Sequence, residues 1–105
     1  MTYIKLGGVR AFPGVKPTKA QALKVLEEAS EVHGAWESTI NCDRMCTECS
    51  HTPRPRLCVS RKRMLDELAD TIQACANLAS ALGVTDITPY LAACEEKNRK
   101  RGRYE

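Results

Sequence analysis

Residues 18–36, TKAQALKVLEEASEVHGAW, carry the helical pattern that decides the fold. Apolar residues recur in this stretch every three or four positions, the spacing of one helix face: Ala22, Val25, Leu26, Ala29, Val32 and Trp36. Thr18 can cap the start of a helix, and Gln21 stands three residues on, which is the capping-box pattern. The stretch therefore predicts a helix from Thr18 to about Trp36.

Two further helices follow from the same reasoning. The second runs from about Ser60 to Leu82, with Gly83 as its stop. The third starts at Thr88-Pro89, a cap followed by a proline at the first helical position. On its apolar side the third helix carries Tyr90, Leu91 and Cys94, and it continues into a basic tail.

The second helix is apolar on two sides. Its main stripe consists of Met64, Leu65, Leu68, Ile72, Cys75, Ala76, Ala79 and Leu82, and a second strip on the opposite side consists of Ala74, Leu78 and Ala81. A helix that is apolar on two faces is usually buried on both. Glu67 and Asp70 project from the side of the second strip, so they are poorly explained as ordinary solvated charges.

The remaining composition is typical of one small helical domain spanning residues 1–105. Only five residues are aromatic, which favours helices packed on Leu, Ala and Val over a β-sandwich. Residues 1–17 contain three glycines and two prolines and predict an irregular arm, with a short strand at Tyr3–Leu6 as an option. Residues 40–60 predict a cysteine-rich loop.

The expected fold is all-α. The first two helices form an antiparallel hairpin, the third helix follows, and pairing of protomers into a dimer or tetramer completes a helical bundle. The first residues contain no apolar segment typical of a secretion signal, and no stretch approaches 18 apolar residues. We therefore expect a cytoplasmic protein with reduced thiols and no membrane partner.

Two pairs of acidic residues stand out on the predicted helices. Glu28 and Glu31 lie three residues apart on the first helix, and Glu67 and Asp70 are spaced in the same way on the second. If the helices pack antiparallel, the four carboxylates converge and require a cation, and all-oxygen ligands suit Mg²⁺. The alternative is that they are ordinary surface acids on amphipathic helices.

The sequence around these pairs resembles a known family. Residues 27–31, EEASE, and 66–70, DELAD, look like the E-E-x-x-E and E-x-x-D signature of MazG-like all-α nucleoside triphosphate pyrophosphohydrolases. The resemblance spans about residues 18–104, including a basic-aromatic segment at 97–104. It implies hydrolysis of a nucleoside triphosphate to the monophosphate and pyrophosphate with Mg²⁺ or Mn²⁺. The implied metal ligands are Glu28, Glu31, Glu67 and Asp70, with Glu27 in the second shell or as a helper base.

Several further residues are candidates for substrate contacts. Lys97, Arg101 and Arg103 can neutralise phosphate oxygens, Asn98 can hydrogen-bond a phosphate or sugar, and Tyr104 can stack or donate its hydroxyl. The alternative for this segment is a solvated basic helix end that complements the helix dipole. Nucleic acid is the less favoured partner, because no recognised binding module accompanies the tail. Trp36 is either a wall against the base or a core residue.

The cysteines allow a second metal hypothesis. Cys42, Cys46, Cys49 and Cys58 fall within 17 residues, with His51 as a spare ligand, and can hold a structural Zn²⁺. Reduced thiols without metal and a disulfide formed during purification remain the alternatives. The competing function is accordingly a zinc-stabilised basic adaptor that binds nucleic acid or a protein and lacks catalysis. The remaining thiols, Cys75 and Cys94, are expected in the core.

Overall fold

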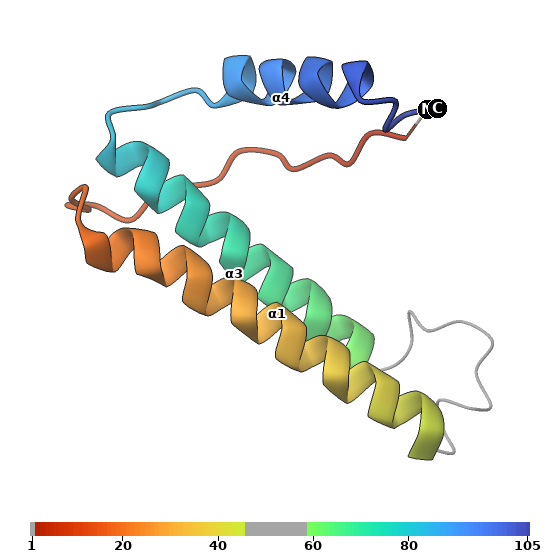
Figure 1. The fold of residues 1–105 in the computed structure, drawn as a ribbon. Helices are drawn as coiled ribbons and strands as arrows, with labels where there is room; N and C mark the ends of the chain where they lie inside the picture. Colours follow the sequence, from red (N-terminus) through yellow and green to blue (C-terminus); the bar gives the residue numbers. More distant parts are fainter. Residues whose placement is uncertain (1, 46–58) are drawn as a thin grey trace.

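The computed structural model describes the backbone of residues 2–45 and 59–105, and the side chains of 2–37 and 61–105. Three helices form it: α1 (Lys19–Met45), α3 (Val59–Ala81) and α4 (Thr88–Lys100). No strand occurs in the described ranges, so the all-α prediction is confirmed there. The helices α1 and α3 lie side by side and run antiparallel, and their packing is the main tertiary contact of the chain (Figure 1). The predicted hairpin is therefore present.

The helix α1 begins where the sequence predicts but ends later. The backbone N–H of Gln21 donates to the Thr18 hydroxyl over 3.3 Å, which confirms the cap. The reciprocal half of the capping box is absent, because the Thr18 N–H donates to the Lys16 carbonyl at 2.8 Å. The helix continues through residues 40–45, where a loop was predicted. No proline interrupts this stretch before Pro53, so nothing in the sequence forces the helix to stop at Trp36.

The helix α3 matches its predicted bounds within one residue at each end, and Gly83 ends it. Gly83 adopts a φ of 81°, which a glycine tolerates because it has no Cβ. Its N–H donates to Ser80 O at 2.9 Å, and the Val84 N–H donates to Ala79 O at 3.0 Å. These two bonds form a Schellman motif, which satisfies the last carbonyl groups of the helix.

The helix α4 has its proline at the expected place, but Thr88 is not its cap. Ile87 occupies the cap position and offers no side-chain bond, whereas the Thr88 N–H donates to Asp86 Oδ1 at 3.0 Å. The capping oxygen therefore comes from a residue two positions earlier than predicted. The other end of α4 closes on Gly102, with a φ of 73°.

The contact between α1 and α3 follows positions of low exposure that recur at helical spacing. We call these ten positions the seam: Gln21, Val25, Glu28, Val32 and Ala35 on α1, and Glu67, Thr71, Ala74, Leu78 and Ala81 on α3. Ala35 and Ala74 are its fully buried members, with 0% and 5% exposed surface. Small alanines at these positions allow the helix backbones to approach closely.

The two apolar faces of α3 are thus used differently from the prediction. The strip with Ala74, Leu78 and Ala81 packs against α1, whereas Leu65, Leu68, Ile72 and Cys75 of the main stripe are exposed. Burial on both faces is therefore not seen in the single chain. Cys94 is exposed as well, so the expectation that Cys75 and Cys94 lie in the core is wrong for this chain alone.

The N-terminal arm, residues 2–17, contains no helix or strand, so the optional strand at Tyr3–Leu6 is not formed. No other extended segment of the described chain offers it a ladder of partners. The arm runs between α3 and α4 (Figure 1). It is tied to α3 by the Phe12 N–H, which donates to Asn77 Oδ1 at 2.9 Å, and by Gln73 Nε2, which donates to Arg10 O at 2.9 Å.

Much apolar surface stays open in the described chain. Neither α1 nor α3 packs extensively against α4, on which Tyr90 and Leu91 are 63% and 50% exposed. Leu26 and Trp36 on α1 are also more than half exposed. Within the described residues, none of the helices has the length and apolar character needed to cross a membrane.

Candidate functional site

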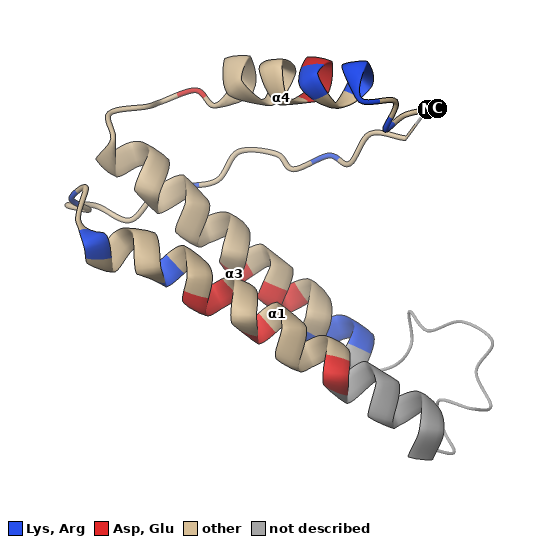
Figure 2. Cartoon of the chain, viewed as in Figure 1, with Lys and Arg blue, Asp and Glu red and all other residues tan. Residues whose placement is uncertain are grey.

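Three of the four predicted ligand carboxylates converge in the hairpin. Glu28 and Glu31 of α1 and Glu67 of α3 each offer a carboxylate oxygen, and these atoms lie within 4.8 Å of one another. Glu28 and Glu67 occupy seam positions and are half-buried, while Glu31 is exposed beside them. Figure 2 shows the acidic residues of α1 and α3 gathered along the middle of the hairpin. The antiparallel arrangement therefore brings three of the four predicted carboxylates together, and Asp70 is not among them.

The electrostatics of this carboxylate cluster, Glu28, Glu31 and Glu67, are unfavourable as they stand. Contact with the Glu67 carboxyl, followed by the negative charge of Glu28, raises the pKa of Glu31 above its ordinary value. Oε2 of Glu67 is buried and has no hydrogen-bond partner among the described residues. Two carboxylates form a hydrogen bond only when one holds a proton, and a cation can take the place of that proton.

The cluster therefore fits a hard divalent cation. Its donors are all carboxylate oxygens, which Mg²⁺ and Mn²⁺ prefer. The open side at Glu31 leaves room for water and phosphate oxygens, as Mg²⁺ requires. Burial without a partner is costly for a polar atom, and a bound cation would remove that cost at Glu67 Oε2.

Glu27 and Asp70 lie beside the cluster. Asp70 is exposed and lines a neighbouring pocket together with Glu28, so it faces the same region from α3 without joining the three converging carboxylates. Glu27 pairs with Lys24, whose Nζ lies 3.6 Å from Glu27 Oε2 and 3.2 Å from Glu28 Oε1. Hydrogen bonding to Glu28, followed by the charges of Glu28 and Glu27, raises the pKa of the Lys24 ammonium.

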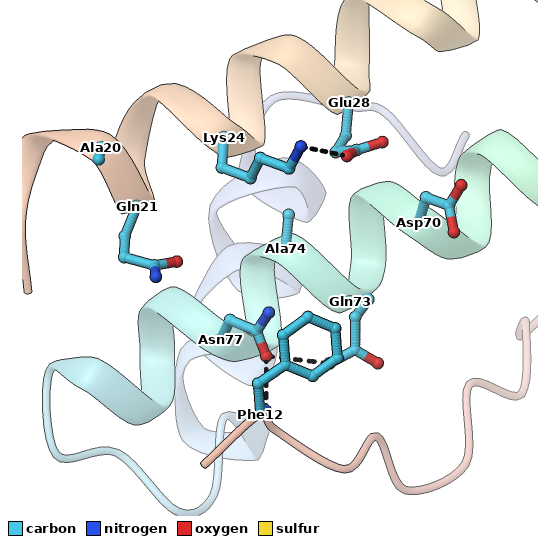
Figure 3. Close-up of a pocket in the computed structure, with 9 residues that line it drawn as sticks. All are labelled: Phe12, Ala20, Gln21, Lys24, Glu28, Asp70, Gln73, Ala74 and Asn77. Carbon is cyan, nitrogen blue, oxygen red and sulfur yellow. Dashed lines mark hydrogen bonds and ion pairs between the residues drawn. The ribbon is translucent and has the colours of Figure 1, made fainter. Parts of the chain in front are cut away.

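The pocket next to the cluster has a volume of about 500 Å³, within the usual range for small-molecule sites. Figure 3 shows Glu28 and Asp70 at one end and Gln21, Asn77 and Phe12 toward the other. The full lining is Phe12, Ala20, Gln21, Lys24, Glu28, Asp70, Gln73, Ala74 and Asn77. The pocket thus combines anionic, cationic, amide and aromatic groups along one groove.

Sequence reasoning missed Lys24, Gln21, Gln73, Asn77 and Phe12. A signal for three of them is present, because Lys24 and Gln21 precede Glu28 by four and seven residues, and Asn77 follows Asp70 by seven. At these spacings the side chains lie on the same helix faces as Glu28 and Asp70, and antiparallel packing brings those two faces together. Phe12 has no such signal, because its place depends on a contact between the arm and α3.

The predicted substrate residues of the tail lie elsewhere in the single chain. Lys97 and Asn98 lie in the last turn of α4, and Arg101, Arg103 and Tyr104 follow its end. None of the five lines the pocket. Figure 2 shows the basic end of α4 apart from the acidic middle of the hairpin. Trp36 is 52% exposed and is also outside the pocket lining, so it is neither a core residue nor a pocket wall in this chain.

The predicted zinc ligands fall outside the side chains that the structure describes. Cys46, Cys49, Cys58 and His51 lie outside the described residues, and only the backbone of Cys42, within α1, is described. No model of a known protein family, no curated protein and no solved structure matches this chain. The function is therefore argued from the site itself.

Proposed function

We propose that this chain is a magnesium-dependent nucleoside triphosphate pyrophosphohydrolase of the MazG-like, all-α class. The observation that carries the proposal is the convergence of Glu28, Glu31 and Glu67 within 4.8 Å, next to a pocket of nucleotide size. The resemblance to the E-E-x-x-E and E-x-x-D signature supports it. Glu28, Glu31, Glu67 and Asp70 are the metal-ligand positions that the resemblance implies. The products are the nucleoside monophosphate and pyrophosphate.

In this proposal, side chains of the two helices hold the cation and contact the triphosphate. Glu28, Glu31 and Glu67 hold the cation, with Asp70 at the pocket side of the same region. A bound Mg²⁺ neutralises phosphate charge and lowers the pKa of a nearby water. Lys24 stands between the cluster and the pocket, and its ammonium can turn from Glu27 to a phosphate oxygen. Water then adds across the bond between the α-phosphorus and its bridging oxygen, and pyrophosphate leaves.

A second copy of the chain completes the proposed enzyme. Leu26 on α1 and Leu65 and Leu68 on α3 are 65%, 46% and 42% exposed, although the sequence places them on apolar stripes. Exposed apolar side chains on adjacent helices indicate an interface in a helical protein. The role predicted for Lys97, Arg101 and Arg103 requires a pairing that brings the basic end of one protomer to the cluster of another.

The direct test is pyrophosphate release from a panel of nucleoside triphosphates, with and without Mg²⁺. We expect release that depends on Mg²⁺ and falls by about 100-fold or more in Glu67→Ala and Asp70→Ala, since both remove charge from the reacting region. Asp66→Ala is the matched control, because Asp66 is the exposed neighbour that pairs with Lys62 at 2.7 Å. Release that survives both substitutions would contradict the site. No release from any nucleotide would favour the adaptor function.

A further inference from the structure

The polar end of the pocket contains a side chain whose burial calls for an explanation. Asn77 is 5% exposed and is the one buried polar residue of the described chain. It lines the pocket from α3, seven residues beyond Asp70. An asparagine is a poor choice for the interior of a helix unless its amide makes specific bonds.

Two backbone groups fix the orientation of the Asn77 amide. The Arg10 carbonyl can only accept, so the Gln73 atom 2.9 Å from it is the Nε2 donor. The same Nε2 donates to Asn77 Oδ1 at 3.0 Å, and the Phe12 N–H, which can only donate, reaches Oδ1 at 2.9 Å. A flipped Asn77 would set its NH₂ group against two donors. Oδ1 therefore faces the arm, and Nδ2 is left on the other side.

The Nδ2 group is consequently a fixed donor that faces the pocket. No described residue accepts a hydrogen bond from it. Figure 3 shows the nitrogen of Asn77 on the side of the amide away from Phe12. Among the described residues, the side chain of Gln21 has no hydrogen-bond partner that would fix its amide, so it can adapt to either a donor or an acceptor. The discriminating group at this end of the pocket is Asn77.

The place of Asn77 along the groove matches the base end of a nucleotide. Seven residues of α1 separate Glu28 from Gln21, a rise of about 10 Å, which leaves room for a sugar and base beyond the phosphates. The Phe12 ring at this end offers an apolar face to a planar base (Figure 3). A fixed N–H donor favours a carbonyl oxygen over an amino group at the edge that it meets.

We propose that Asn77 is the base-reading residue and selects nucleotides whose base carries a carbonyl group where adenine and cytosine carry an amino group. This proposal rests on the proposed function for the triphosphate end of the site. The substrates are then nucleotides with a keto base, namely uracil, thymine, guanine or hypoxanthine.

The test compares bases that differ in this group and in the proton on the adjacent ring nitrogen. Hydrolysis of inosine and adenosine triphosphates, and of uridine and cytidine triphosphates, gives kcat/KM for two matched pairs. We expect the keto member of each pair to be favoured about tenfold or more, because an amino group opposite Nδ2 leaves two donors unpaired. Asn77→Asp keeps an oxygen toward Phe12 and Gln73 and replaces the donor with an acceptor, so the preference should shift toward adenine and cytosine.

Ser80→Asp is the matched control, since it adds the same charge to the exposed side of α3 one turn later. Binding of inosine and adenosine monophosphates without metal, measured by calorimetry, provides a readout that does not depend on catalysis. If Asn77→Asp fails to fold, the binding preference of the unmodified protein still tests the role of Asn77. Equal binding and equal hydrolysis of the pair members would overturn the role of Asn77 and leave the hydrolase intact. Selective binding without hydrolysis would support Asn77 and overturn the hydrolase.

Discussion

The carboxylate cluster, Glu28, Glu31 and Glu67, and the acids of the outer surface have different surroundings. On the outer surface, Asp66 pairs with Lys62 at 2.7 Å, Glu96 bonds to the Arg99 guanidinium, and Asp86 accepts from the Thr88 N–H. In the carboxylate cluster, Glu67 Oε2 is buried and has no partner among the described residues, and the nearest charged neighbours of Glu31 are other carboxylates. These surface acids have local partners, whereas Glu31 and Glu67 crowd together, and this contrast supports the proposed cation.

The largest effect expected from this contrast is on catalysis. Glu31→Gln removes one negative charge and one metal donor without changing the size of the side chain. We expect kcat/KM for pyrophosphate release to fall by about 100-fold or more, the usual scale for losing a group that stabilises charge at the reacting centre. Glu37→Gln, an exposed acid of α1 that pairs with His33, should leave the rate within twofold. Equal rates for both variants would remove the distinction between the carboxylate cluster and the surface.

A smaller effect is expected on stability. Glu67→Gln should raise the free energy of unfolding without metal by about 1 kcal/mol, because it relieves repulsion between half-buried carboxylates. The unmodified protein should gain about 2.7 kcal/mol from Mg²⁺ at 100 times its Kd, and Glu67→Gln should lose most of this gain. Thermal unfolding with EDTA and with Mg²⁺ measures both quantities. Asp66→Asn is the control, and a Mg²⁺ response that is the same in both variants would contradict the assignment.

Lys24 tests the same comparison, because its ammonium pairs with Glu28 of the cluster. Lys24→Met keeps the length of the side chain and removes its charge. We expect KM for the triphosphate to rise about tenfold with a smaller change in kcat, since Lys24 is proposed to contact a phosphate that is present before and after the reaction. Lys62→Met, which breaks the surface pair with Asp66, should change neither constant. A loss confined to kcat would instead assign Lys24 to the reacting bond.

The smallest effect concerns an outer acid. Bonding from the Thr88 hydroxyl, and then from its N–H, lowers the pKa of Asp86. A lowered pKa means that the stabilisation of α4 is present above the unfolded value, about 3.9, and is lost as the pH falls through the folded value. Amide chemical shifts of α4 between pH 5 and pH 2 should show this loss, and Asp86→Asn should abolish it. Glu95→Gln changes another exposed acid, within α4, and serves as the reference variant. Its amide shifts should still show the loss at low pH.

The sequence predicts the helices and the acidic pairs better than it predicts their surroundings. Periodicity and Gly83 locate α3, and the spacing of Glu28, Glu31 and Glu67 anticipates their convergence. The choice between the two apolar faces of α3 is not predictable in this way. Close packing favours the alanine strip, whereas hydrophobicity alone ranks the leucine stripe first. The sequence therefore identifies the acidic pairs but not which face of α3 packs.

The amide end of the pocket lies beyond such reasoning for a different reason. Phe12 reaches Asn77 across 65 positions of the chain, through a hydrogen bond from a backbone N–H that carries no side-chain signature. Contacts of this kind depend on where an irregular arm docks, and periodicity does not encode that. The tail at 97–104 poses a related difficulty, because its predicted role involves a second protomer.

The central claim is that carboxylates from two helices share one divalent ion. Crystals grown with millimolar Mn²⁺, examined at the manganese absorption edge, test this most directly. We predict one anomalous peak per chain at coordination distance from Glu28, Glu31 and Glu67, and its absence in crystals of Glu67→Gln. An ordered cluster with no such peak in the unmodified protein would contradict the account.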